Sequence, residues 1–88
     1  MTVTELAAMA GLGTHQFARS FRAAVGRSPQ QYVIALRLER ARHLLSSTRL
    51  PIAEIALRCG FFDQAHLATT FTRAGGVPPS RYRRETSN

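Results

Sequence analysis

The 88-residue sequence has no lysine and no tryptophan, a single cysteine and few acidic residues. The lone Cys59 excludes a disulfide framework or a cysteine-rich zinc site, and its place in an apolar helical pattern favours a small buried residue over a reactive thiol. His15, His43 and His66 show no metal-ligand spacing, and no general base stands near a matched carboxylate. The sequence therefore predicts no metal, no cofactor and no catalysis.

Long apolar runs are also missing. No stretch approaches the roughly 20 residues that a membrane span needs, and the opening segment Met1–Glu5 lacks the basic and apolar regions of a signal peptide. Together with the unpaired cysteine, this predicts a reducing interior. No membrane partner is expected.

The charge has one dominant sign. Twelve basic residues, all of them arginine, stand against 5 acidic ones, which gives a formal net charge of +7 and a pI of about 11.5. This is the charge pattern of a polyanion binder, and the planar fork of arginine suits bidentate pairing with phosphate or a guanine edge. Codon bias is an alternative explanation for arginine over lysine, but it does not explain the excess of positive charge.

The chain contains an internal repeat. A short apolar helix, a glycine turn and a second helix with apolar residues four apart form a helix-turn-helix pattern, and the second copy has one extra residue in its turn. The first copy comprises Val3–Ala7, Gly11, Phe17 and Phe21, and the second comprises Ile52–Ala56, Gly60, Leu67 and Phe71. Two such units in one basic chain match the repeat of the major groove on one face of duplex DNA.

The first copy opens with a capping box in which Thr2 accepts from the backbone of Glu5 and the Glu5 side chain bonds back to Thr2. Leu6, Ala7 and Ala10 then form an apolar stripe, and residues 11–13 break the helix. The next helix is predicted from Thr14 to Ala24. Its core face holds Phe17, Phe21 and Val25, and its outward face holds His15, Ala18, Arg19 and Arg22.

A long uninterrupted helix is predicted between the copies. Ser28 is its N-cap and Pro29 its first residue, and the helix continues from Gln30 to about Ser47. About 18 residues span roughly 27 Å, which would hold two flanking units at a fixed separation; a free coiled-coil segment is the alternative. Its seam is formed by Val33, Ile34, Leu38, Ala41, Leu44 and Leu45, with Arg37, Arg40 and Arg42 pointing away.

The second copy is predicted to begin near Pro51 and to turn at residues 60–63, where Asp63 caps a helix from Gln64 to about Ala74. Leu67 and Phe71 are its core residues. Residues 75–76 stop it, residues 79–84 form a short closing helix, and residues 85–88 are expected to be frayed.

These residues resemble the signature of the AraC/XylS family of bacterial transcription regulators, and the resemblance covers nearly the whole chain. It is carried by Ile52–Ala56, Cys59–Phe61, His66, Leu67, Phe71, Gly76, Val77, Pro79, Tyr82 and Arg83, with Gly26, Ser28, Pro29, Tyr32, Arg37, Leu38, Ala41, Leu44 and Leu45 in the central segment. The resemblance implies an all-α domain in which two helix-turn-helix units put recognition helices into adjacent major-groove segments. It also implies contact with promoter DNA and RNA polymerase, usually for activation, and a cytoplasmic, nucleoid-associated location.

The expected organisation is one DNA-binding domain over residues 1–88. It divides into a first helix-turn-helix at 1–27, a linker helix at 28–47, a second helix-turn-helix with closing helix at 48–84, and the frayed tail at 85–88. Compared with the family, the opening helix and an effector-binding or dimerisation domain are missing. Gly75 replaces a usual side chain, and Thr69 replaces an arginine often found on the second recognition helix.

The two outward faces differ in chemistry. At the positions matching His15, Ala18, Arg19 and Arg22, the second copy has Ala65, Ala68, Thr69 and Thr72. Arginine can read guanine, whereas small side chains can touch thymine methyl groups or allow close backbone approach. Arg19 is therefore the first candidate base reader. The full set of base-contact candidates is His15, Ala18, Arg19, Arg22, Gln64, Ala65, His66 and Thr69. The phosphate-contact candidates are Thr14, Arg37, Arg40, Arg49, Ser80, Arg81 and Arg83. For all of these except Thr14, solvated surface charge is the alternative, and the sequence does not separate it from phosphate contact.

Two other functions remain open from the sequence. The arginine face could meet an acidic protein partner, which would make the chain a protein-interaction module, or it could bind nucleic acid without sequence preference. Competition between a specific duplex and bulk genomic DNA distinguishes these possibilities from specific binding of double-stranded DNA.

Overall fold

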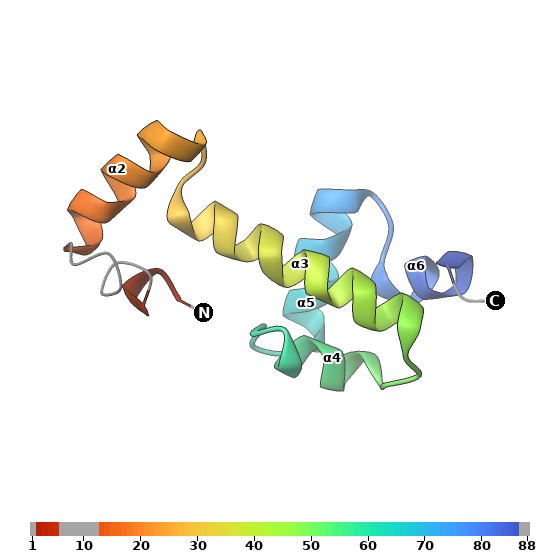
Figure 1. Ribbon diagram of the computed structural model, residues 1–88. Coiled ribbons are helices and arrows are strands. Elements are labelled where there is room, and N and C mark those ends of the chain that lie inside the picture. The colour runs from red at the N-terminus through yellow and green to blue at the C-terminus, as the bar shows by residue number, and fades with distance from the viewer. Residues whose placement is uncertain (1, 6–12, 87–88) are drawn as a thin grey trace. The chain divides into compact units, whose positions relative to one another are not determined.

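The computed structural model describes residues 2–5 and 13–86, and within this part of the chain all regular structure is helical (Figure 1). The helices are α2 (Thr14–Val25), α3 (Pro29–Ser47), α4 (Ile52–Arg58), α5 (Gln64–Gly75) and α6 (Pro79–Thr86). The all-α prediction is confirmed, and the predicted helix limits lie within two residues of these bounds. No helix among the described residues is long and apolar enough to cross a membrane.

The chain divides into two compact units, Met1–Leu36 and Arg37–Asn88. The boundary lies inside α3, whereas the sequence predicted that this helix is a separate linker between the two units. Each unit therefore contains one part of α3.

In the first unit, the Oγ1 of Thr2 accepts a hydrogen bond from the backbone N–H of Glu5 at 3.1 Å, and residues 3–5 are helical. The Thr2 half of the predicted capping box is confirmed, and among the described residues the Glu5 side chain forms no bond back to Thr2. The predicted stripe of Leu6, Ala7 and Ala10 and most of the turn after it lie outside the described residues.

The α2 helix packs through its aromatic side chains. Phe17 is buried and Phe21 half-buried, with their ring centroids 5.5 Å apart. Val25 is 47% exposed, so the prediction that it faces the core is wrong. Val25 is the last residue of the helix, and the chain reverses directly after it at Gly26, so its side chain lies beyond the packed face.

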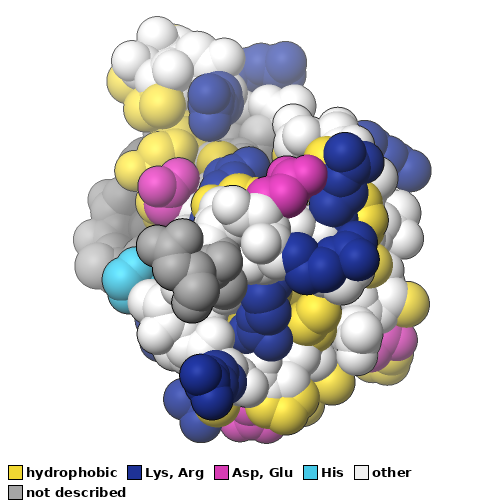
Figure 2. Space-filling view, turned by 90° about the vertical axis from the view of Figure 1, so that its right-hand side faces the viewer, with side chains coloured by type: hydrophobic (Ala, Val, Ile, Leu, Met, Phe, Trp, Pro, Cys, Tyr) yellow, Lys and Arg dark blue, Asp and Glu magenta, His cyan; other side chains and the backbone are white. Residues whose placement is uncertain are grey.

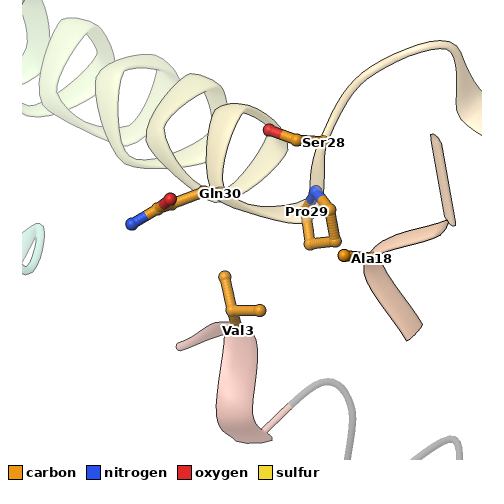
Figure 3. Close-up of a pocket in the computed structure, with 5 residues that line it drawn as sticks. All are labelled: Val3, Ala18, Ser28, Pro29 and Gln30. Carbon is orange, nitrogen blue, oxygen red and sulfur yellow. The ribbon is translucent and has the colours of Figure 1, made fainter. Parts of the chain in front are cut away.

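A reciprocal capping box begins α3. The backbone N–H of Gln31 donates to the Oγ of Ser28 at 3.2 Å, and the N–H of Ser28 donates to the Oε1 of Gln31 at 3.1 Å. The predicted N-cap is confirmed, and Gln31 completes it. Beside this turn lies a cavity of about 280 Å³ lined by Val3, Ala18, Ser28, Pro29 and Gln30, with the side chain of Val3 directed toward Pro29 (Figure 3).

The second unit contains the larger core. The α4 helix packs on α5, and α5 packs on α6 (Figure 1). Cys59 is buried at the end of α4, as predicted; burial raises the pKa of its thiol, and the charge of Arg40 partly opposes that shift. The buried apolar side chains of this unit are Leu38, Ala41, Leu45, Ile55, Ala56, Cys59, Phe61, Leu67 and Phe71.

The internal repeat extends further than the sequence pattern indicated. Gly26 and Gly76 end α2 and α5 in the same left-handed conformation, each with φ of 81°. In each unit, a tyrosine of the following helix packs against a phenylalanine of the helix before it. The ring centroids of Phe21 and Tyr32 lie 5.3 Å apart in the first unit, and those of Phe71 and Tyr82 lie 5.3 Å apart in the second. Each unit therefore includes the start of the helix that follows α2 or α5.

Two arginines of α3 do not point away as predicted. The guanidinium of Arg42 lies 5.5 Å from the centroid of the Phe71 ring, and Arg37 is half-buried against the turn at Gly60. A Cβ atom added to Gly60 would come within 3.0 Å of the Nε of Arg37. The guanidinium of Arg42 therefore covers the Phe71 ring, and the Arg37 side chain occupies the space beside Gly60.

The closing helix is longer than predicted. It continues to Thr86, so the expectation of a frayed tail is wrong for Glu85 and Thr86, while residues 87–88 lie outside the described part. Glu85 pairs with the Nε of Arg81 at 2.9 Å, and the hydroxyl of Thr86 donates to the carbonyl oxygen of Tyr82 at 2.8 Å. These two side-chain bonds extend the helix by about half a turn.

Candidate nucleic-acid interface

Each unit has its own candidate surface: the exposed face of α2 in the first unit and the exposed face of α5 in the second, each being the second helix of a helix-turn-helix. In α5, Asp63 is the N-cap, and its Oδ1 accepts from the backbone N–H of His66 at 2.8 Å. The predicted cap is confirmed. Since Leu67 and Phe71 bury the opposite side of α5, the helix is fixed with a defined face toward water.

The outward face of α5 is made of small side chains. Ala65, Thr69 and Thr72 are exposed, whereas Ala68 is half-buried. With Arg73, three of these residues (Ala68, Thr69 and Thr72) line an open depression of about 500 Å³. A surface of this kind has room for an approaching partner and few charged groups with which to bind it.

The N-terminal end of α5 carries the candidates Gln64 and His66. Gln64, the first residue of α5, is exposed. His66 uses Nδ1 to accept the backbone N–H of Phe62 at 3.3 Å, and its ring lies edge-on to Phe61 with centroids 5.3 Å apart. Because Nδ1 is an acceptor, the proton of the neutral ring is on Nε2, which is left as a donor.

The matching face of α2 is charged. Arg19 and Arg22 are both exposed and form no ion pair with the described acidic residues, so both guanidinium groups are available to a partner. Ala18 is half-buried and lines the cavity beside α3 (Figure 3). The side chains of the candidates Thr14 and His15 lie outside the described part of the structure.

The candidates for phosphate contact fall into two groups. Arg40, Arg49 and Ser80 are exposed, and so is Arg81, although Arg81 pairs with Glu85 on its own helix. Surface pairs of this kind contribute little and can be exchanged for another partner. The other two candidates, Arg37 and Arg83, are less accessible to a phosphate. Arg37 packs against Gly60, and Arg83 donates a hydrogen bond to the backbone of Leu45.

Arg83 binds to the end of another helix. Its Nε donates to the carbonyl oxygen of Leu45 at 3.1 Å, and its Nη2 is buried without a hydrogen-bond partner among the described residues. This contact joins α6 to the last turn of α3, where carbonyl groups lack partners within the helix. Arg83 therefore has a structural role in the second unit.

The few acidic side chains are engaged locally. Glu39, Glu54 and Glu85 each pair with an arginine on the same helix, at 3.8, 3.0 and 2.9 Å. Figure 2 shows arginine side chains spread over one face of the molecule, among smaller acidic patches. The excess positive charge is thus available to a polyanion. Among the described residues, no group of three or more histidine, cysteine, aspartate or glutamate side chains could hold a metal ion.

Sequence reasoning missed two features near this interface. Arg73 was not a candidate, although it is exposed beside Thr69 and Thr72 on α5. The sequence pattern places Phe62 only in a turn, yet its side chain is 85% exposed. For Arg73 the signal was present, since a position four residues after Thr69 lies on the same face of a helix.

A model described as a helix-turn-helix domain matches residues 6–85. The chain is therefore a helix-turn-helix protein, and it belongs to the AraC/XylS type of that family. It is 35% identical over 82 residues to the "Probable transcriptional regulator LumQ" of Photobacterium leiognathi, covering 93% of this chain and 33% of that protein. It is 38% identical over 65 residues to the "HTH-type transcriptional activator RhaR" of Salmonella arizonae, covering 74% of this chain and 23% of that protein.

Among solved structures, the chain is similar to the DNA-binding domain of the global transcriptional factor AdpA in complex with a target DNA. The TM-score is 0.89 at 35% identity, and the match covers 97% of this chain and 77% of the other. The chain spans about a third or less of the length of the curated relatives described above.

Proposed function

We propose that this chain binds double-stranded promoter DNA in a sequence-specific way and thereby regulates transcription, with activation as its mode. The observation that carries the proposal is the pair of matched helices α2 and α5, each held by a buried aromatic core with a defined face exposed to water. Membership of the AraC/XylS type and the similarity to a domain solved with its target DNA support it. A cytoplasmic, nucleoid-associated location follows from this function.

The two helices are proposed to enter successive major-groove segments and to contribute unequally. Arg19 and Arg22 on α2 supply charged forks for guanine and phosphate, with His15 and Thr14 beside them. On α5, Gln64 and the Nε2 donor of His66 read base edges, while Ala65 and Thr69 permit close approach. The first unit is therefore the dominant reader.

The exposed residues Arg40, Arg49, Arg73, Ser80 and Arg81 are proposed to contact phosphates. Such contacts position a protein on the duplex without reading its sequence. RNA polymerase and an effector-binding or dimerisation domain of a longer protein are proposed as further partners.

Selection of bound duplexes from a random pool by the 88-residue chain, followed by competition with bulk genomic DNA, tests the proposal. We expect one enriched sequence that resists the competitor. Binding that the competitor removes in proportion to its concentration would favour the non-specific binder. Failure to bind any duplex would favour a protein-interaction module.

A further inference from the structure

Phe62 is an exposed aromatic side chain in a chain that otherwise packs its phenylalanines. Its exposed fraction is 85%, whereas those of Phe17, Phe61 and Phe71 are 9%, 4% and 1%. Among the described residues, the other exposed large apolar side chains are aliphatic: Val25 at 47%, Leu36 at 43% and Leu57 at 61%. Phe62 is thus far more exposed to water than the other described aromatic side chains.

The position of Phe62 is fixed by its neighbours on both sides. Its own N–H donates to the Nδ1 of His66 at 3.3 Å, the preceding Phe61 is buried under the edge of the His66 ring, and the following Asp63 caps α5 at 2.8 Å. The backbone of the turn is therefore held before any partner arrives. Ordering this residue on binding costs little free energy.

Phe62 lies one residue before the N-cap of α5, at the end of the helix that carries Gln64 and His66. In helix-turn-helix complexes, this end of the recognition helix meets the base edges. A duplex presents apolar groups there as well as polar ones, namely the methyl group of thymine and the C–H faces of deoxyribose. An exposed aromatic ring complements those groups.

We propose that Phe62 is an apolar DNA contact of the second unit, which packs its ring against a deoxyribose face or a thymine methyl group at the start of α5. The inference rests on the proposed function, because it assumes a duplex bound at α5. A protein partner fits less well. One phenylalanine side chain buries only about 150–250 Å², far below the roughly 1,200–2,000 Å² of a stable protein interface, and the adjoining side chains Asp63 and Gln64 are polar.

The test compares Phe62→Ala, Phe62→Leu and the matched control Leu57→Ala in the 88-residue chain. Affinity for the duplex selected by the wild-type chain is measured at several salt concentrations. Phe62→Ala should bind about 5- to 30-fold more weakly with an unchanged salt slope, because an apolar contact releases no counterions. Phe62→Leu should recover part of the loss, and Leu57→Ala should bind like the wild type. Unchanged thermal midpoints would show that the variants are folded, as expected for exposed side chains.

Replacing thymine by uracil in the selected duplex identifies the apolar group. Weaker binding by the wild type, but not by Phe62→Ala, assigns the contact to a methyl group; equal binding of both duplexes assigns it to deoxyribose. Wild-type affinity in Phe62→Ala, or a loss equal to that of Leu57→Ala, would overturn the inference while leaving the proposed function intact. Failure of the wild-type chain to select a duplex would instead overturn the proposed function.

Discussion

At the scale of single residues, the difference between Arg19 and Thr69 has the clearest consequence for binding. Both occupy the same place in their units and both are exposed. Arg19→Ala should cost about 1–3 kcal/mol of specific binding and relax the preference at one base pair, as loss of a bidentate guanine contact does. Thr69→Ala should cost much less, because a threonine side chain cannot form a fork to a base edge.

Titrations of these two variants against the selected duplex and a scrambled one provide the measurement. A larger loss of specificity for Thr69→Ala would reverse the assignment of the dominant reader. Equal losses on both duplexes would mean that the arginine face supplies charge alone.

Substitutions of two further arginines should have different effects, one on the stability of the fold and the other on DNA binding. Arg83 donates to the carbonyl oxygen of Leu45 from a half-buried position, so Arg83→Ala should lower the free energy of unfolding by about 1–3 kcal/mol. Arg40 is exposed, so Arg40→Ala should leave stability unchanged and reduce the salt slope of DNA binding by about one. Urea unfolding and salt-dependent titration of both variants test this pair, and the opposite assignment of the two effects would contradict it.

At the scale of helices, the C-terminal end of α5 can be made more stable by a single substitution. Gly75 is its last residue, has no positive φ, and has only the Nη2 of Arg42, at 4.0 Å, near the place where a Cβ would lie. Gly75→Ala should therefore raise the free energy of unfolding by about 0.5–1 kcal/mol, because alanine restricts the unfolded chain. Thermal melts measure this. Gly76→Ala is the matched control and should destabilise, because Gly76 has φ of 81°.

The packed faces of α2 and α5 should differ in their sensitivity to truncation. Phe71 is 1% exposed and contacts both the Tyr82 ring and Arg42, so Phe71→Ala should cost about 3–5 kcal/mol. Phe21 occupies the equivalent place on α2 but is only half-buried, so Phe21→Ala should cost less. Equal midpoints for Phe71→Ala and the wild type in chemical denaturation would contradict the packing described here.

The helices themselves were largely predictable because local chemistry specifies them. Ser28 and Asp63 act as N-caps as predicted, since their side-chain oxygens satisfy backbone donors wherever the next residues can form a helix. The packing of Arg37 and Arg83 was not predictable, because it depends on residues far away in the sequence. Periodicity assigned Arg37 to the outward surface, and Arg83 was a candidate for phosphate contact; only the tertiary contacts with Gly60 and Leu45 show otherwise.

At the scale of the whole molecule, the repeat predicts how much DNA one chain covers. Two readers in one chain need no palindrome, so a monomer should protect an asymmetric site with two major-groove segments about 10 base pairs apart, centre to centre. Footprinting of a monomeric complex measures this. Protection of a single segment would show that only one of the two units reads the DNA.

The candidate interface was predictable only in outline. The repeat located α2 and α5, because the spacing of Phe17, Leu67 and Phe71 defines their buried sides and so their exposed ones. It could not reveal that the His66 ring binds the backbone of Phe62, because that contact depends on the shape of the turn. Side-chain partners in a turn follow from its three-dimensional course, which a periodic pattern does not describe.

The single thiol of the chain has a practical consequence for following the second unit in solution. Cys59 is 4% exposed, and burial raises its pKa, so a thiol reagent can modify it only when the end of α4 opens. The rate of modification therefore reports how often that unit opens, and no engineered label is needed. A change in that rate on adding a duplex would measure directly how strongly the DNA holds the second unit closed.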